Sequence, residues 1–294
     1  MAENSVFIDP SKLAGAVILY HPDESLAQNI RSYQQSVSKL YLIDNSEVVN
    51  ESLLQGIFSQ LGSYEYVGLQ ENKGIAYALN VAAQKACADG FQWLLTMDQD
   101  SQASPQMIDK LIEASKGLPM QQVGILAPQF VHESTSKSKE KEPLEEVDVA
   151  ITSGNILNLS IYQKVGPFRN DFFIDFVDHE YCLRLNLNGY KVIVANNIPL
   201  LHKLGNVKKI RIAGHTLETS NHNFIRRYYI TRNRLAVLAQ FKSYFKTNQK
   251  FENTTYLREI LKITLFEKDK LRKLRSVYWG YKDFKNNRFG KYMH

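Results

Sequence analysis

Cysteines are rare in this sequence, and long apolar runs are absent. Only Cys87 and Cys182 occur among 294 residues, and neither belongs to a CxxC pair. This pattern favours a reducing compartment over a disulfide-stabilised secreted domain. Every apolar run is far shorter than the roughly 20 residues that span a bilayer. Residues 1–5 have neither the basic region nor the apolar segment of a secretory signal. We therefore expect a protein of the cytoplasm.

Two common nucleotide-binding motifs are also missing. The first expected strand, at 14–20, is followed by His21-Pro22-Asp23 rather than by a GxGxxG turn, and the GxxxxGK[ST] phosphate loop does not occur. The commonest nucleotide-binding α/β classes are therefore disfavoured.

What the sequence does contain is an alternation of short apolar runs with helical segments. Hydrophobic residues make up 44% and charged residues 22% of the chain, as in globular proteins. The pattern predicts an α/β fold with a mostly parallel central sheet flanked by helices. From 221 helical periodicity takes over, so we expect an α/β domain at 1–220 and a basic helical region at 221–294. The expected strands are 14–20, 40–44, 64–69, 91–97, 122–127, 147–152 and 191–195.

The clearest candidate binding site is the end of the fourth expected strand, where an apolar run stops at Asp98-Gln99-Asp100. In open α/β sheets, ligands bind outside the carboxyl ends of the strands. In an extended backbone, residues two apart point the same way, so the two carboxylates would lie side by side. A divalent cation such as Mg²⁺ or Mn²⁺, bridged to phosphate oxygens, suits such a pair. The alternative is a solvated turn, because Asp and Ser are ordinary turn residues.

Polar residues also follow the first three strands. Asp23 comes after the first, Asp44-Asn45 after the second and Glu71-Asn72 after the third. Because the carboxyl ends of parallel strands meet at one edge of a sheet, these turns describe a site assembled along that edge.

Two later segments add candidate functional groups. Asp178 follows the apolar stretch 172–177, so partial burial would suit it as a general base. Glu180 is either functional or an acidic residue that stabilises a helix N-terminus. His202 follows an apolar strand, and it is either structural or a ligand of the divalent cation.

The C-terminal third differs from the rest in charge. Residues 203–294 hold 22 Lys and Arg against 6 Asp and Glu, a net charge of +16, which leaves 14 against 24, or −10, for residues 1–202. Partners that fit the basic part are an anionic membrane surface, nucleic acid or an anionic substrate.

Two expected helices of this basic region have distinctive faces. Arg226 and Arg232 lie on the first, where they either bind phosphate bidentately or form an ordinary basic face. The second is amphipathic, with Leu257, Leu261 and Leu265 on one side.

Taken together, these motifs resemble family 2 glycosyltransferases, which have the GT-A fold, and within them the rhamnosyltransferase branch. Asp98-Gln99-Asp100-Ser101 resembles the family's DxD motif. Several motifs in the right order are far more specific than a single DxD. The others, within about residues 14–240, are Asn72-Lys73-Gly74-Ile75-Ala76 with Asn80, Ser153-Gly154-Asn155, Phe173 to Arg184, and Arg226-Arg227-Tyr228-Tyr229 with Arg232-Asn233.

The resemblance implies a nucleotide-sugar donor and gives residues their roles. Asp178 matches the catalytic base, with Glu180 as the alternative because Val177 stands where many members have Glu. For the donor, the resemblance implies base and ribose contacts for Asp44, Asn72 and Gly74, and stabilisation of the departing diphosphate by Arg226 and Arg232. For the cation, it implies that Asp98 lies near the ribose and metal, that Asp100 binds the ion and that His202 completes the metal or diphosphate site. Asn155 and Glu180 would make acceptor or secondary contacts.

The implied activity is that of an inverting, metal-dependent hexosyltransferase of polysaccharide or cell-wall biosynthesis. The expected donor is dTDP-L-rhamnose, with UDP-galactose, UDP-glucose or UDP-N-acetylglucosamine as alternatives. The expected acceptor is a hydroxyl of a polysaccharide or lipid-linked glycan.

The expected partners and location follow from the same resemblance. The basic C-terminal region would hold a cytoplasmic enzyme at the inner face of the plasma membrane, or it would pack as a helix pair with a solvated basic face. A nucleic-acid-binding protein is disfavoured because no nucleic-acid motif appears, and a catalytically silent sugar-binding relative is a third class. The oligomeric state is open, with a homo-oligomer as one alternative.

Overall fold

In a computed structural model, the chain forms two compact units. The structure describes residues 7–131, 142–201, 208–212, 215–219, 221–246 and 249–294. Unit 1 comprises Met1–Arg169 and Asp178–Lys203, and unit 2 comprises Asn170–Val177 and Leu204–His294. The chain thus divides near 203, whereas the start of helical periodicity suggests a boundary at 220.

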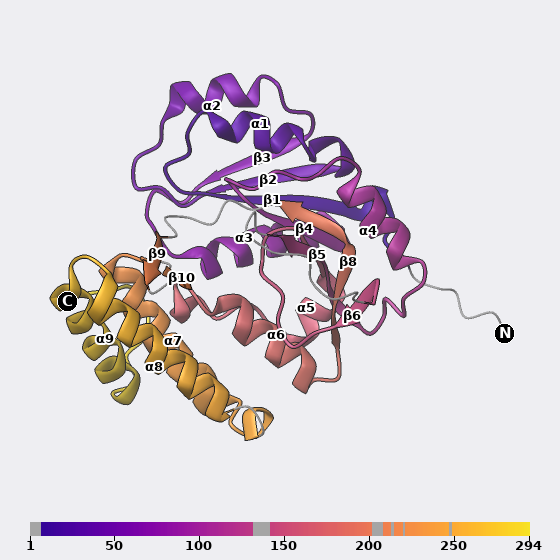
Figure 1. Cartoon of the computed structure of the whole chain (residues 1–294). Coiled ribbons are helices and arrows are strands. Elements are labelled where there is room, and N and C mark those ends of the chain that lie inside the picture. Colours follow the sequence, from indigo (N-terminus) through magenta and orange to yellow (C-terminus); the bar gives the residue numbers. More distant parts are fainter. Residues whose placement is uncertain (1–6, 132–141, 202–207, 213–214, 220, 247–248) are drawn as a thin grey trace. The chain divides into compact units, whose positions relative to one another are not determined.

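Within the described residues, unit 1 is built on an eight-stranded sheet of order β3-β2-β1-β4-β7-β5-β8-β6 (Figure 1). The strands β3, β2, β1 and β4 are parallel neighbours, as are β5 and β8, while β7 and β6 run antiparallel to the strands beside them. The sheet is therefore mostly parallel, as the sequence predicts. The strands are β1 (Leu13–Leu19), β2 (Lys39–Asp44), β3 (Tyr64–Gly68), β4 (Trp93–Asp98), β5 (Val123–Val131), β6 (Leu144–Glu146), β7 (Asn155–Asn158) and β8 (Lys191–Leu201).

Helices cover both faces of this sheet. The helices of unit 1 are α1 (Ser25–Arg31), α2 (Glu51–Phe58), α3 (Ile75–Ala88), α4 (Met107–Ser115), α5 (Leu159–Val165) and α6 (Val177–Leu187). Figure 1 shows α1 and α2 on one side of β1–β3 and α3 on the other. Because β1 to β4 run parallel to one another, the polar residues that follow these strands lie at one edge of the sheet.

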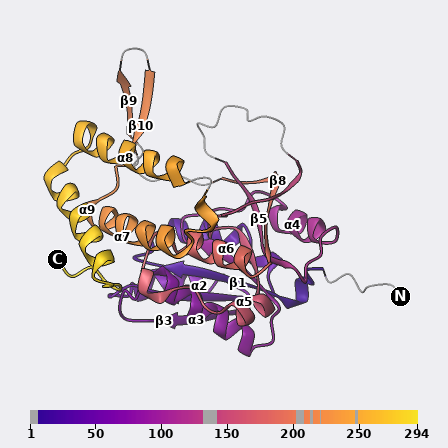
Figure 2. The same cartoon turned by 90° about the horizontal axis from the view of Figure 1, so that it is seen from below.

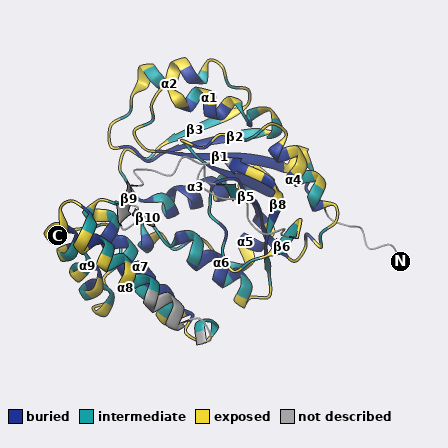
Figure 3. Ribbon diagram, viewed as in Figure 1, coloured by how far each residue is buried: buried dark blue, intermediate teal, exposed yellow. Residues whose placement is uncertain are grey.

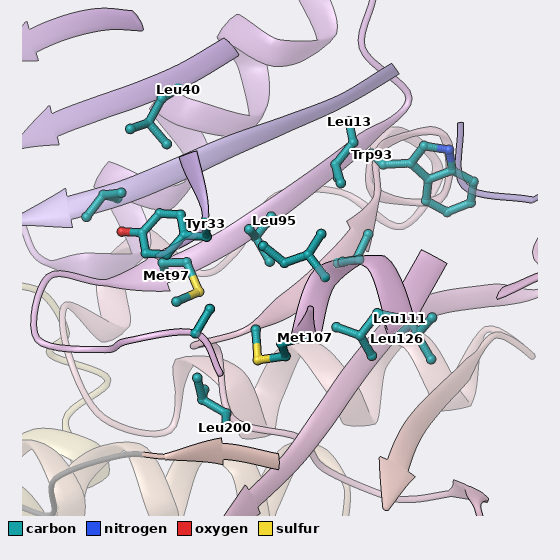
Figure 4. Packing of buried hydrophobic residues seen from close by; sticks show 14 of the residues in the cluster. Leu13, Tyr33, Leu40, Trp93, Leu95, Met97, Met107, Leu111, Leu126 and Leu200 are labelled. Atoms are coloured by element: carbon teal, nitrogen blue, oxygen red, sulfur yellow. The ribbon is translucent and has the colours of Figure 1, made fainter. Parts of the chain in front are cut away.

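The core follows the alternation of side chains along each strand. On β1, Leu13, Val17 and Leu19 join the cluster formed with α1, α2 and α4. Figure 4 shows part of this cluster, including Tyr33 and Met97. The opposite face of β1 carries the small Ala14 and Ala16, and the helix that packs on β1 and β2 there is α3. Small residues on both elements allow close approach. The buried alanines of α3 are Ala76, Ala78, Ala82, Ala83 and Ala86.

One expected strand is wrong. Residues 147–152 form no strand, because β6 ends at Glu146 and β7 begins only at Asn155. β7 itself is inserted between β4 and β5. Its four residues include an Asn at each end, so the sequence carries little strand signal there.

Unit 2 contains a β-hairpin and a group of helices. The hairpin pairs β9 (Lys208–Ile212) with β10 (His215–Thr219) in antiparallel fashion, and the two strands lie side by side in Figure 2. The helices are α7 (Phe224–Gln240), α8 (Gln249–Phe266) and α9 (Lys270–Lys285). Gly280 lets α9 approach α7, since a Cβ there would lie 2.6 Å from the Tyr228 carbonyl oxygen. No helix among the described residues has the length and apolar character needed to cross a membrane.

Candidate functional site

The strand ends predicted to form a site are joined by hydrogen bonds in unit 1. At the end of β2, Asp44 is only 1% exposed. Its Oδ1 accepts from the Ser46 backbone N–H (2.9 Å) and its Oδ2 from the Tyr66 hydroxyl (2.9 Å). Both carboxylate oxygens therefore hold the turn after β2 in place. Asp44 therefore supports the turn at the end of β2, and its buried carboxylate offers little exposed surface to a ligand.

The turn after β3 is fixed to the turn after β2. Asn45 donates from Nδ2 to Asn72 Oδ1 (3.1 Å) and accepts at Oδ1 from the Lys73 N–H (2.8 Å). Asn72 Oδ1 also accepts from the Gly74 N–H (3.1 Å). Gly74 has φ +87°, a conformation that glycine adopts readily, and it caps the N-terminus of α3. The expected residues Asn72 and Gly74 thus lie beside the end of β2.

The Asp98-Gln99-Asp100 segment spans the end of β4 and a turn. Asp98 is the last strand residue, whereas Gln99 and Asp100 lie in the turn, so the two carboxylates do not share one extended backbone. Gln99 connects this turn to the end of β1, because its Oε1 accepts from the Tyr20 N–H (2.7 Å) and its Nε2 donates to the Tyr20 carbonyl (3.0 Å). Asp100 is exposed.

Asp98 has an aromatic neighbour on the core side. Burial, together with the negative charge of Asp98, raises the pKa of the Tyr33 hydroxyl far above its ordinary value. Tyr33 is 1% exposed and therefore stays protonated near the carboxylate. Nothing in the sequence singles out Tyr33, because 65 positions separate it from Asp98.

The segment Ser153–Asn155 is attached to β4. The Asp98 N–H donates to Ser153 Oγ (3.1 Å), and Ser153 Oγ donates to Ser101 Oγ (2.8 Å). Gly154 has φ +83°, and a Cβ there would lie 2.7 Å from Pro128 Cγ. Only glycine meets both conditions without displacing its neighbours. The tight turn brings the Asn155 side chain toward the start of α6.

Asp178 and Asn155 line the same small cavity of unit 1, whose volume is about 10 Å³. That is close to the space one water molecule needs. Asp178 is 23% exposed in its side chain, and its Oδ1 accepts from the His179 N–H (2.8 Å). Within the described residues, Asn155 Oδ1 and the hydroxyl of Tyr181, which also lines the cavity, have no hydrogen-bond partner. The sequence reasoning missed Tyr181, which looks like an ordinary core residue of α6.

Glu180 has a different environment from Asp178. Its carboxylate is 1% exposed in the protein and receives Arg184 Nε at Oε1 (3.0 Å) and the Arg184 guanidinium NH2 at Oε2 (2.9 Å). Arg184 also donates to the carbonyl oxygens of Val165 (3.0 Å) and Pro167 (2.8 Å). A buried bidentate pair of this kind holds α6 to the segment after α5, and it leaves the Glu180 carboxylate little access to a substrate.

The expected arginines lie in unit 2. Arg226 is 42% exposed in its side chain and forms a bidentate ion pair with Asp175. Arg232 is fully buried, and it donates to the carbonyl oxygens of Asp171 (3.1 Å), Phe172 (3.0 Å) and Gly290 (2.8 Å). Arg232 therefore holds the backbone of residues 171–172 and Gly290 in place.

Asn233 completes this set of contacts with segment 170–177. Its Nδ2 donates to the carbonyl oxygens of Phe172, Ile174 and Asp175, each at 2.9 Å. The segment is strained, because Phe173, Asp175 and Phe176 all have φ between +62° and +68°. Residues other than glycine rarely adopt this left-handed backbone conformation, and such strain persists only where neighbouring contacts enforce it.

The predicted metal site is only partly covered by the structure. Within the residues described, no group of three or more His, Cys, Asp or Glu side chains is placed to hold a metal ion. His202 lies outside the described residues. Asp98 and Asp100 supply the hard oxygen ligands that Mg²⁺ and Mn²⁺ prefer, and the exposed Asp100 carboxylate is accessible to such an ion.

Comparison with known proteins identifies the family. The family model for glycosyl transferase family 2 matches residues 29–177. The dTDP-rhamnosyl transferase RfbF of Shigella flexneri is 25% identical over 246 residues, a match that covers 78% of this chain and 80% of that protein.

Solved structures show the same fold. GalNAc-T7, crystallised with UDP, GalNAc and Mn²⁺, is 13% identical with a TM-score of 0.58 over 97% of this chain and 58% of its own. S. aureus TarS is 11% identical with a TM-score of 0.56 over 94% of this chain and 49% of its own. The chain thus spans about half of each of these two proteins. A shorter TarS form, residues 1–349 with UDP-GlcNAc, gives a TM-score of 0.55 at 13% identity over 93% and 80%. The expected α/β fold of GT-A type is confirmed.

Proposed function

The chain belongs to glycosyl transferase family 2, and from this premise we propose that it is an inverting glycosyltransferase that uses dTDP-L-rhamnose. The observation that carries the proposal is the match to a dTDP-rhamnosyl transferase over 78% of the chain. The acceptor is a hydroxyl of a polysaccharide or of a lipid-linked glycan. A UDP-hexose is the second candidate donor, because two of the structural relatives were crystallised with UDP or a UDP-sugar.

The donor would lie along the rim formed by the ends of β2, β3 and β4. Asn72 and Gly74, which are joined by a hydrogen bond, would contact the base and ribose, and Asp44 shapes this part of the rim through Ser46 and Tyr66. Asp98 is partly exposed and Asp100 is exposed, which suits the ribose side and the diphosphate side of the donor respectively.

A divalent cation fits the carboxylates at the end of β4. Asp98 and Asp100 would hold Mg²⁺ or Mn²⁺, with His202 as a further ligand. When bound, such an ion supplies positive charge that stabilises the departing nucleoside diphosphate. Arg226 is the arginine with exposed surface to assist in this, whereas Arg232 acts by holding segment 170–177.

We assign the general base to Asp178. A base must reach the proton of the acceptor hydroxyl. Asp178 is partly exposed and lies at the first turn of α6, while Glu180 is buried and bidentately paired with Arg184. In the proposed step, the acceptor oxygen bonds to the anomeric carbon as the bond from that carbon to the diphosphate oxygen breaks. The hydroxyl proton passes to Asp178, and the diphosphate leaves with the bonding electrons. Asn155, which lines the same cavity, would contact the acceptor.

The substitution Asp178→Asn tests this assignment. Asn has the same size but is a very weak base, so turnover of dTDP-rhamnose should fall by about 10²–10⁴, while donor affinity measured by calorimetry should stay within about twofold of the wild type. Glu180→Gln serves as the contrast. It leaves Arg184 without its ionic partner and should lower the melting temperature. An active Asp178→Asn enzyme would exclude Asp178 as the base. Turnover of UDP-hexoses in preference to dTDP-rhamnose would show that the donor is a UDP-hexose.

A further inference from the structure

The helix α8 exposes a ridge of leucines. Leu257, Leu261 and Leu265 are 61%, 57% and 58% exposed, and their four-residue spacing places them along one face. The other face is the one that packs, since Ile263 is buried and the Tyr256 hydroxyl donates to Thr231 Oγ1 (3.0 Å). The apolar stripe found in the sequence therefore does not serve the core of unit 2. Figure 3 shows exposed positions along the described part of α8 and along α9.

The helix α9 also exposes large apolar side chains. Leu271, just inside α9, is 85% exposed, and Tyr278 and Tyr281 are about half exposed. Their spacing from Leu271, of seven and ten residues, keeps them on the outer side of the helix. Soluble monomers rarely expose so many large apolar side chains on one helical hairpin unless the surface binds something.

Exposed basic residues stand next to these apolar ones in the sequence, as Arg258 does to Leu257 and Lys270 to Leu271. Residues 203–294 carry 22 Lys and Arg against 6 Asp and Glu. Several of the acidic residues are already paired inside unit 2, as Glu267 is with Arg227 and Lys273. The exposed basic residues of α8, of α9 and of the turn between them are Arg258, Lys268, Lys270, Arg272, Arg275 and Lys285.

We infer that the outer face of α8 and α9 docks on an anionic phospholipid surface. Leucines that enter the acyl boundary, tyrosines at the headgroup level and lysines and arginines beside anionic headgroups are the composition of an interfacial helix. A symmetric contact between two copies would bring basic residues against basic residues, which like-charge repulsion opposes. The docking does not depend on the proposed glycosyl transfer. It would place the enzyme beside a lipid-linked acceptor if that function holds.

The test is co-sedimentation of the full-length protein with vesicles of phosphatidylcholine, with and without phosphatidylglycerol. The wild type should bind the anionic vesicles at least about tenfold more tightly than the neutral ones, and this preference should weaken as salt is added. Replacing Leu257, Leu261 and Leu265 together by Ser should reduce binding at least about tenfold, because it removes the apolar ridge. Replacing Arg258, Lys268 and Lys270 by Gln should reduce binding by roughly fivefold for each charge.

Two controls separate this docking from other effects. Val48→Ser with Leu187→Ser removes similarly exposed apolar side chains from unit 1 and should leave vesicle binding unchanged. Circular dichroism and calorimetric binding of dTDP-rhamnose should be the same for all variants, so that loss of folding or of the donor site is visible separately. Wild-type protein that does not bind anionic vesicles, or a leucine variant that binds as well as the wild type, overturns the inference. A wild-type dimer that the leucine variant converts to monomers in gel filtration assigns the face to self-association instead.

Discussion

At the scale of single residues, the candidate site contains groups that look alike in the sequence and differ in their surroundings. Asp178 and Glu180 are two positions apart, yet one is partly exposed and the other is buried against Arg184. Arg226 and Arg232 share a helix, yet only Arg226 retains exposed surface. The sequence could propose these residues because their types carry the chemistry. It could not separate them, since burial depends on partners distant in the chain.

Asp100 is the residue whose predicted role is most directly testable. It is exposed at the end of β4, so Asp100→Asn should not disturb packing. Loss of one anionic ligand should weaken cation-dependent binding of dTDP-rhamnose at least about tenfold. The measurement is calorimetric donor binding in Mn²⁺ and in EDTA. Asp109→Asn, an equally conservative change at an exposed position of α4, should bind like the wild type. Wild-type donor binding that is unaffected by EDTA would show that a divalent cation is not needed to bind the donor.

At the scale of elements, the parallel βαβ part was predictable and the inserted elements were not. β1, β2 and β4 are largely apolar runs that alternate with helices, and such local patterns appear directly in the sequence. β7 is short, and it is a strand because β4 and β5 pair with it from both sides. The contact between Asp175 and Arg226 links positions 51 residues apart. Local propensity holds no information about such pairings.

The strained segment Asn170–Val177 gives the element-scale prediction. Asn233→Asp keeps the size of the side chain but removes the N–H groups that three carbonyl oxygens accept. It also places an anion beside those oxygens. Leaving buried acceptors unpaired costs about 1–3 kcal/mol, so the melting temperature should fall.

The same substitution should also affect turnover. Val177 is bonded to Asp178, and release of the strained segment should therefore lower kcat more than it raises KM. The control Asn287→Asp makes the same chemical change at an exposed position of unit 2 and should have little effect. An Asn233→Asp enzyme with wild-type stability and kcat would show that the hydrogen bonds from Asn233 do not control the conformation of segment 170–177.

At the scale of the whole molecule, charge and folding divide the chain in a similar place. The excess of basic residues begins near 203, and so does the larger part of unit 2. Unit 2 buries a few of its charges in networks, one of which joins Arg227, Glu267 and Lys273. Burial alone would raise the pKa of Glu267, but hydrogen bonds from Lys273 and Thr219 and the charge of Arg227 lower it overall. Acid should therefore destabilise unit 2 by protonating such carboxylates.

His222 allows this pH dependence to be measured at one position. Burial first, and then the positive charges of Arg226 and Arg227, lower the pKa of His222 from 6.5 to about 4; Lys273 acts in the same direction, and Glu267 opposes it. The unfolded chain therefore binds a proton that the folded chain does not over this range. The stabilising contribution is complete above the unfolded pKa and is lost as the pH falls from about 6.5 towards 4.

His222→Gln should flatten this part of the profile, because Gln does not titrate. Between pH 7 and pH 5 the wild type should lose on the order of 1–2 kcal/mol more than the variant in the free energy of unfolding. Guanidinium titrations followed by tryptophan fluorescence monitor both units, since Trp279 lies in unit 2 and Trp93 in β4 of unit 1. Equal slopes for His222→Gln and the wild type would mean that His222 already binds its proton in the folded protein, and that the destabilisation by acid comes from the carboxylates alone.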